Sequence, residues 1–245
     1  MSLTISLARK AGACLLLCLC ALQPAQASVV IEGTRIVYPA AQKEATVRMH
    51  NKGNKVVLMQ VWADRGNPVS QAQDADAPFL MTPPIFRLDP ARSQTVRVIF
   101  TGEPLPQDRE SVFWFNSLEV PATPANKGQN YMQIAVRSRL KVFYRPEGLR
   151  GNPAEAARSL EWKLVTDGVT TVLQGRNPSP FHVSLGTVAL VQDGKRHDAG
   201  NGMIEPFGTL EFALESRGGN AAGGQVSYGW ISDYGAVEQR EAPLR

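Results

Sequence analysis

The stretch of sequence that decides the fold reads YMQIAVRSRLKVFYRP, residues 131–146. Apolar residues alternate with polar or small ones in its first half, and we call Met132, Ile134 and Val136 the apolar row. A period of two residues puts successive side chains on opposite faces of a β-strand. The row could therefore pack into the protein's own core or bind a partner. Periodicity alone favours the core, because apolar strand faces usually point inward.

The rest of the chain shows the same β-rich pattern and no long helical periodicity. Short runs of β-forming residues are separated by turn residues about every ten positions, as in antiparallel sandwiches. In the first half these runs lie at 29–37, 45–51, 56–64, 85–88, 94–100, 111–120 and 131–144. In the second half they lie at 160–166, 170–174, 181–191, 203–204, 209–214, 226–232 and 237–240. Seven strands are typical of an immunoglobulin-like domain, so the sequence predicts an all-β fold with two such sandwiches.

The first 27 residues have the pattern of a secretory signal peptide. Arg9 and Lys10 precede a short apolar run at 11–22, and Ala25-Gln26-Ala27 supplies a small-x-small cleavage site. This run is too short to span a bilayer, which takes about 20 residues, so we expect export to the periplasm without membrane insertion. Pro and Gly then cluster in RPEGLRGNP at 145–153, which predicts domains at 28–147 and 148–245.

Charge, cysteines and motifs exclude several classes of protein. All 3 cysteines lie within the leader, and losing Arg9 and Lys10 lowers the formal charge from +4 to +2. That charge, without a run of Lys and Arg residues, is too small to indicate nucleic-acid binding. The histidines are scattered, and neither a phosphate-binding loop nor a metal-ligand spacing occurs. We therefore expect neither an enzyme nor a cofactor.

Four further blocks occur in a fixed order around the opening stretch. They read TRIVY at 34–38, TPPIFRL at 82–88, LPQDRES at 105–111 and DYG at 233–235. Together with residues 131–146, they resemble periplasmic pilus-assembly chaperones of the chaperone–usher pathway over most of the mature chain. The resemblance implies two immunoglobulin-like sandwiches arranged as a boomerang with a cleft between them. The short, cysteine-free segment at 121–130 resembles the short-loop branch of that family.

The resemblance assigns a task to the apolar row. Pilus subunits lack their last strand. Members of this family supply that strand until the subunit is transferred to an outer-membrane usher. Met132, Ile134 and Val136 are then expected to fill the subunit's groove, while Arg35 and Lys141 grip its terminal carboxylate. Lys141 has the opposite parity to the row, so we expect a twist or bulge to turn it toward the cleft. Without a subunit, the exposed edge is expected to self-pair into weak dimers.

A second set of charged residues matches a network that holds the two domains at a fixed angle in this family. By resemblance, its members here are Arg97, Glu110 and Asp233. The same resemblance makes Thr82-Pro83 a candidate cis peptide, although trans is the default for an X–Pro bond.

The resemblance therefore predicts a periplasmic chaperone that folds, caps and delivers pilus or fimbrial subunits. One alternative is an exported structural protein, a pilin or adhesin that uses the same edge strand for polymerisation. Two linked sandwiches with a cation pair in one cleft argue against it. The other alternative is an enzyme on a β-sandwich, which the lack of a catalytic motif disfavours.

Overall fold

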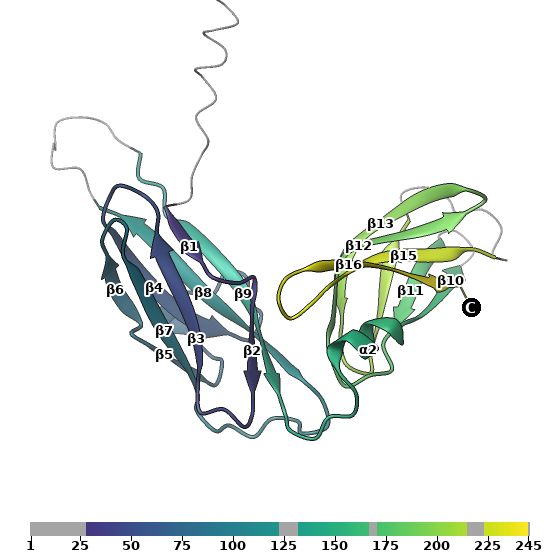
Figure 1. Ribbon diagram of the computed structural model, residues 1–245, viewed down its shortest axis with the longest axis horizontal. Coiled ribbons are helices and arrows are strands. Elements are labelled where there is room, and N and C mark those ends of the chain that lie inside the picture. The colour runs from purple at the N-terminus through teal and green to yellow at the C-terminus, as the bar shows by residue number, and fades with distance from the viewer. Residues whose placement is uncertain (1–27, 123–131, 167–170, 215–222, 245) are drawn as a thin grey trace, which may run out of the picture.

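The computed structural model describes residues 28–122, 132–166, 171–214 and 223–244. The predicted leader at 1–27 and most of the short loop at 121–130 lie outside these ranges. Two β-rich domains meet at one end and splay apart, which gives the chain the outline of a boomerang (Figure 1). Each domain is a sandwich of two sheets around its own core. The predicted all-β class with two immunoglobulin-like sandwiches is confirmed.

The first domain packs a four-stranded sheet on a five-stranded one. In spatial order, one sheet contains β1 (Val29–Ile31), β3 (Ala45–Asn51), β7 (Ser93–Phe100) and β5 (Phe79–Thr82). The other contains β2 (Arg35–Pro39), β9 (Val136–Arg145), β8 (Ser111–Pro121), β4 (Val57–Asp64) and β6 (Ile85–Leu88). A 3-10 turn, η1 (Ala72–Asp74), lies between β4 and β5. Strands β2 and β9 run parallel, whereas the other pairs are antiparallel.

The second domain packs a three-stranded sheet on a four-stranded one. The smaller sheet contains β10 (Glu161–Thr166), β11 (Thr171–Arg176) and β14 (Thr209–Ala213). The larger contains β13 (Lys195–Ile204), β12 (Val183–Gln192), β15 (Gln225–Ile231) and β16 (Val237–Pro243). Its short helix α2 (Pro153–Arg158) is capped by Asn152, whose side chain accepts a hydrogen bond from the Glu155 amide at 2.9 Å. Trp162 and Tyr228 are among the largest side chains in this core.

Several strands differ from the sequence-based prediction, among them β9, which begins at Val136 and not at residue 131. The run at 29–37 divides into β1 and β2, in opposite sheets, at Gly33, whose φ of +90° favours glycine. Strand β5 was missed because its first three residues are all apolar, which hides the alternation of buried and exposed side chains. Strand β13 is longer than the predicted run at 203–204. The prediction was too short because β13 is an edge strand, and its many polar residues hide the apolar pattern.

Two backbone features follow expectations from the sequence. Asp193 and Gly194 join β12 to β13 with φ values of 51° and 72°, the positive pair that a tight hairpin turn requires. The Thr82-Pro83 peptide bond is cis, as the resemblance implied. Among the residues described, no helix has the length and hydropathy needed to cross a membrane.

Candidate functional site

The side of the first domain that faces the second is formed by β2 and β9 (Figure 1). Residues 141–144 of β9 pair with β8 on one edge and with β2 on the other, and Arg145 pairs with β2. Residues 136–140 pair with β8 alone, and residues 132–135 pair with no strand within the described ranges. An open strand edge of this kind is a template for pairing with another chain.

The apolar row leads into this strand: Met132 and Ile134 precede β9, and Val136 is its first residue. Met132, Ile134 and Val136 are 85%, 65% and 43% exposed. Residues of the same parity further along β9 are buried in the core: Leu140, Val142 and Tyr144. The same face of this segment is therefore buried where the opposite sheet covers it, and it is exposed beyond the end of the sandwich. The core assignment that periodicity alone favoured is wrong for the three residues of the row.

Arg35 and Lys141 are direct neighbours, because β2 and β9 pair at these two residues. Nη1 of Arg35 donates to the carbonyl of Ile231 in the second domain at 3.0 Å. The buried Nε of Arg35 has no hydrogen-bond partner in the described part of the chain. Nζ of Lys141 lies 5.7 Å from the centre of the Trp114 ring. Within the described ranges, neither residue of this cation pair forms a salt bridge with a carboxylate.

Burial and mutual repulsion both oppose the charges of the cation pair. Burial lowers the pKa of Lys141, and the neighbouring Arg35 guanidinium lowers it further. Burial also lowers the pKa of Arg35, an effect that the charge of Asp233 partly offsets. An anion between the two side chains would relieve this repulsion. The cation pair is thus suited to bind a carboxylate through charge-assisted hydrogen bonds.

The bulge expected to turn Lys141 toward the cleft does not occur. Strand β9 keeps an unbroken register with β8, from Ser111↔Tyr144 to Glu119↔Val136, and with β2. No bulge is needed, because paired residues of parallel strands point to the same side of the sheet. Lys141 therefore shares the outer face with Arg35, while the even-numbered residues of β9 face the core.

A network of ion pairs beside the cation pair joins the two domains. Nε of Arg145 donates to Glu110 at 2.7 Å, and its Nη1 and Nη2 donate to the two oxygens of Asp233 at 2.9 and 3.1 Å. Glu110 is 3% exposed and accepts a further hydrogen bond, of 2.8 Å, from the amide of His182. Its own amide donates to the carbonyl of Pro180 at 2.9 Å. Asp233, His182 and Pro180 belong to the second domain, so the network fixes one sandwich against the other.

The expectation that Arg97 belongs to this network is wrong. Arg97 is on β7, in the four-stranded sheet, and its Nε donates to Glu44 at 2.6 Å with half of its side chain exposed. Arg145 takes the expected place, and Glu110 and Asp233 are brought together as predicted. A signal for Arg145 was present in the sequence, because it shares the parity of Lys141 on the same strand.

The charge of Arg145 is compensated, unlike the charges of the cation pair. Burial alone would lower the pKa of Arg145, but its hydrogen bonds to Asp233 and the charge of Glu110 raise it on balance. One inter-domain arginine is therefore neutralised by two carboxylates, whereas Arg35 and Lys141 are left facing each other.

Comparison with known proteins gives a consistent result over both domains. The model described as pili and flagellar-assembly chaperone, PapD N-terminal domain, matches residues 28–150, and that of the pili assembly chaperone PapD C-terminal domain matches 155–242. The chain is 42% identical to the chaperone protein FimB/FhaD of Bordetella pertussis, over 90% of this chain and 89% of that protein. It is 39% identical to the probable fimbrial chaperone YadV of Escherichia coli, over 94% and 96% of the two chains.

Solved structures give the same result. The crystal structure of the YadV chaperone matches with a TM-score of 0.77, over 89% of this chain and 100% of that one. A second match is a chain of the crystal structure of the Salmonella enterica SafA pilin in complex with the SafB chaperone. It is 27% identical to this chain with a TM-score of 0.72, over 91% of this chain and 97% of that one. This protein therefore belongs to the PapD-like family of pili assembly chaperones.

Proposed function

We propose that this protein is a periplasmic chaperone that folds and caps pilus or fimbrial subunits and delivers them to an outer-membrane usher. The observation that carries the proposal is that one strand, β9, continues the exposed apolar row and bears one member of the cation pair. The relatives named as fimbrial chaperones, and SafB in complex with a pilin, support a pilus subunit as the partner. Family membership favours this function over the exported pilin or adhesin that the sequence left open.

The open edge of β9 is the part that would complete a subunit. A sandwich that lacks its last strand exposes an apolar groove and an unpaired sheet edge, and both promote aggregation. Residues 132–140 offer unpaired backbone groups for the edge, and the apolar row offers side chains for the groove. Chaperone–pilin pairs bind by strand addition, so this binding mode follows from the family. Each side chain moved from water into the groove contributes roughly 1.5–3 kcal/mol, before ordering costs.

The cation pair would set the register of the added strand. A slip of two residues leaves the same face of a strand against the groove, so the apolar row alone cannot fix the register. Arg35 and Lys141 would fix it by binding the subunit's terminal carboxylate. Each charge-assisted hydrogen bond of this kind contributes about 1.5–3 kcal/mol.

The proposed cycle requires binding and exchange rather than catalysis. The next subunit's own N-terminal segment would displace β9 from the groove, so we propose no nucleotide, cofactor or enzymatic step. In the part of the chain that the structure describes, no group of three or more His, Cys, Asp or Glu side chains is placed to hold a metal ion.

Co-expression with a pilin encoded beside this chaperone tests the proposed function. The pilin is expected to accumulate as a soluble complex that co-purifies with the chaperone, with mass spectrometry establishing its identity. Equal recovery of soluble pilin with and without the chaperone would refute the proposal.

Replacing Ile134 with Asp is expected to weaken subunit binding without an appreciable change in the chaperone's melting temperature. Ile134 is 65% exposed in the free protein, so the charge meets water there, but it would meet an apolar groove in the complex. Thermal unfolding of the free variant and titration with the subunit measure the two effects. A large drop in melting temperature would mean that this side chain packs inside its own domain.

The free chaperone is expected to form weak dimers through the same exposed edge. Two copies could pair their β9 edges and shield their apolar rows from water. Sedimentation across a range of concentrations should show a monomer–dimer equilibrium that Ile134→Asp shifts toward monomer. A single monomeric species at all concentrations would contradict this expectation.

A further inference from the structure

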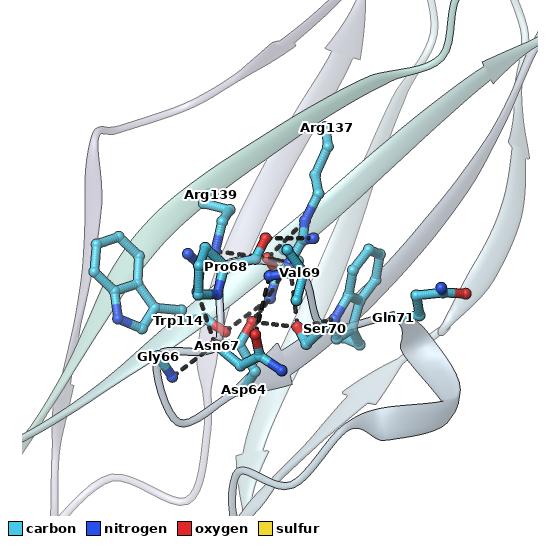
Figure 2. A network of polar contacts seen from close by, with 12 residues as sticks. Asp64, Gly66, Asn67, Pro68, Val69, Ser70, Gln71, Trp114, Arg137 and Arg139 are labelled. Carbon is cyan, nitrogen blue, oxygen red and sulfur yellow. Dashed lines mark hydrogen bonds and ion pairs between the residues drawn. The ribbon is translucent and has the colours of Figure 1, made fainter.

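A buried carboxylate on the outer face of the five-stranded sheet lies outside the cation pair and the inter-domain network. Asp64, the last residue of β4, is 0% exposed and lies within the polar network of Figure 2. One oxygen accepts hydrogen bonds from the amide of Gly66 and from Nη2 of Arg139, both at 2.7 Å. The other accepts from the Ser70 hydroxyl and the Asn116 side-chain amide, also at 2.7 Å. A single carboxylate thus ties together β4, β8, β9 and the loop that follows β4.

Two arginines connect this carboxylate to β9. Nε of Arg139 and Nη2 of Arg137 both donate to the side-chain oxygen of Asn116, at 3.0 and 2.6 Å. The Arg137 guanidinium lies 4.9 Å from the centre of the Trp62 ring. That of Arg139 lies 4.5 Å from the centre of the Trp114 ring. Hydrogen bonds and stacking therefore fix both side chains on the outer face of the strand.

These contacts act on the half of β9 that is otherwise held least. Residues 136–140 have a neighbouring strand on one edge only, among the residues described. On the core-facing side of this half, Leu140 alone is buried. Residues 141–144, by contrast, pair on both edges, and Val142 and Tyr144 pack into the core. The first half is therefore held from its outer face, through Arg137 and Arg139.

We propose that Asp64 is a positioning residue for the donor strand. Through Arg137 and Arg139 it sets the path of residues 136–140, and hence the direction in which the apolar row leaves the sandwich. This inference rests on the proposed function, in which a subunit binds that row. A strand already held in its bound path loses less conformational freedom on binding, so Asp64 contributes to capture without touching the subunit.

The carboxylate is charged in this role. Burial would raise the pKa of Asp64, but hydrogen bonds from Ser70, Gly66 and Asn116, with the charge of Arg139, lower it on balance. Replacing Asp64 with Asn keeps the size of the side chain, and removes the charge that faces the two guanidinium groups.

A positioning role and a purely structural role predict different patterns of amide hydrogen exchange. If Asp64 only stabilised the domain, Asp64→Asn would speed exchange in both halves of β9 through global unfolding. A positioning role predicts exchange about tenfold faster in residues 136–140 of the free protein, with residues 141–145 nearly unchanged. Capture of the pilin should fall by a similar factor at a temperature where the variant is fully folded.

A matched control removes a different carboxylate that binds the same loop. Glu103 accepts a hydrogen bond from Arg65 of that loop at 2.6 Å and is exposed. Glu103→Gln is expected to leave both the exchange of β9 and the capture of the pilin unchanged. If Asp64→Asn does not fold, Arg137→Gln serves instead, because it leaves the contact between Asp64 and Arg139 intact. It should give the same selective pattern with a smaller amplitude.

Uniform acceleration along β9, or selective acceleration with wild-type capture, would overturn the inference. The exchange experiment needs no subunit, so it is independent of whether the wild-type chaperone binds one. Failure of the wild-type protein to capture the pilin would instead refute the proposed function.

Discussion

Replacing Arg35 or Lys141 with Ala is expected to abolish capture of the pilus subunit and leave the chaperone folded. Each substitution removes charge-assisted hydrogen bonds of about 1.5–3 kcal/mol, or roughly ten- to hundredfold in Kd. It also removes the feature that would set the register of the donor strand. Co-expression with the pilin measures capture, and circular dichroism of the purified variants checks the fold.

The control for this prediction is Lys195→Ala, which removes the same charge from an exposed hairpin of the second domain. It should leave capture unchanged. A stable, soluble complex of the pilin with either Arg35→Ala or Lys141→Ala would show that the cation pair is not the carboxylate anchor.

The cation pair also gives capture a pH dependence with a defined sign. The folded-state pKa of Lys141 is lowered from 10.5, so between the two values the unfolded chain binds more protons than the folded one. The stability of the free chaperone should therefore rise with pH through this window, as Lys141 loses its charge. Capture should weaken over the same window, because a neutral amine no longer attracts the carboxylate. Lys141→Met should remove this contribution to the stability profile.

The part of the site that the sequence predicted depends on local pattern and on family resemblance. Alternation in residues 131–146 predicted a strand, and Arg35 and Lys141 were paired by resemblance alone. Alternation could not show where the sandwich ends, so it could not show that the apolar row is exposed. That depends on which strands cover the face, a property of both sheets rather than of one segment.

Charge partners were predicted less well, because they depend on which sheet and face carries each residue. The resemblance assigned Arg97 to the inter-domain network. Its strand, β7, lies in the four-stranded sheet of the first domain, whereas Arg145 is on β9 in the five-stranded sheet. The contacts of Asp64 draw on three strands and a loop that are far apart in sequence. No motif marks such a set, and the fold is needed to bring it together.

The largest effect on stability is expected for Arg145→Met. The Glu110 side chain is 2% exposed, so losing Arg145 would leave its charge in the interface with His182 as its one remaining partner among the described residues. Breaking a buried ion pair in this way costs about 3–5 kcal/mol. Chemical denaturation measures this loss. Small-angle scattering should also show a broader range of angles between the domains.

The control for Arg145→Met is Arg97→Met, which removes an arginine from an exposed ion pair within the first domain. It should change neither the unfolding free energy nor the scattering appreciably. Equal effects of the two substitutions would mean that the inter-domain network does not hold the sandwiches together. If the network does hold them, Arg145→Met should weaken capture as well. The carbonyl of Ile231 that binds Arg35 is only two residues from Asp233, so a loosened interface would also loosen the cation pair.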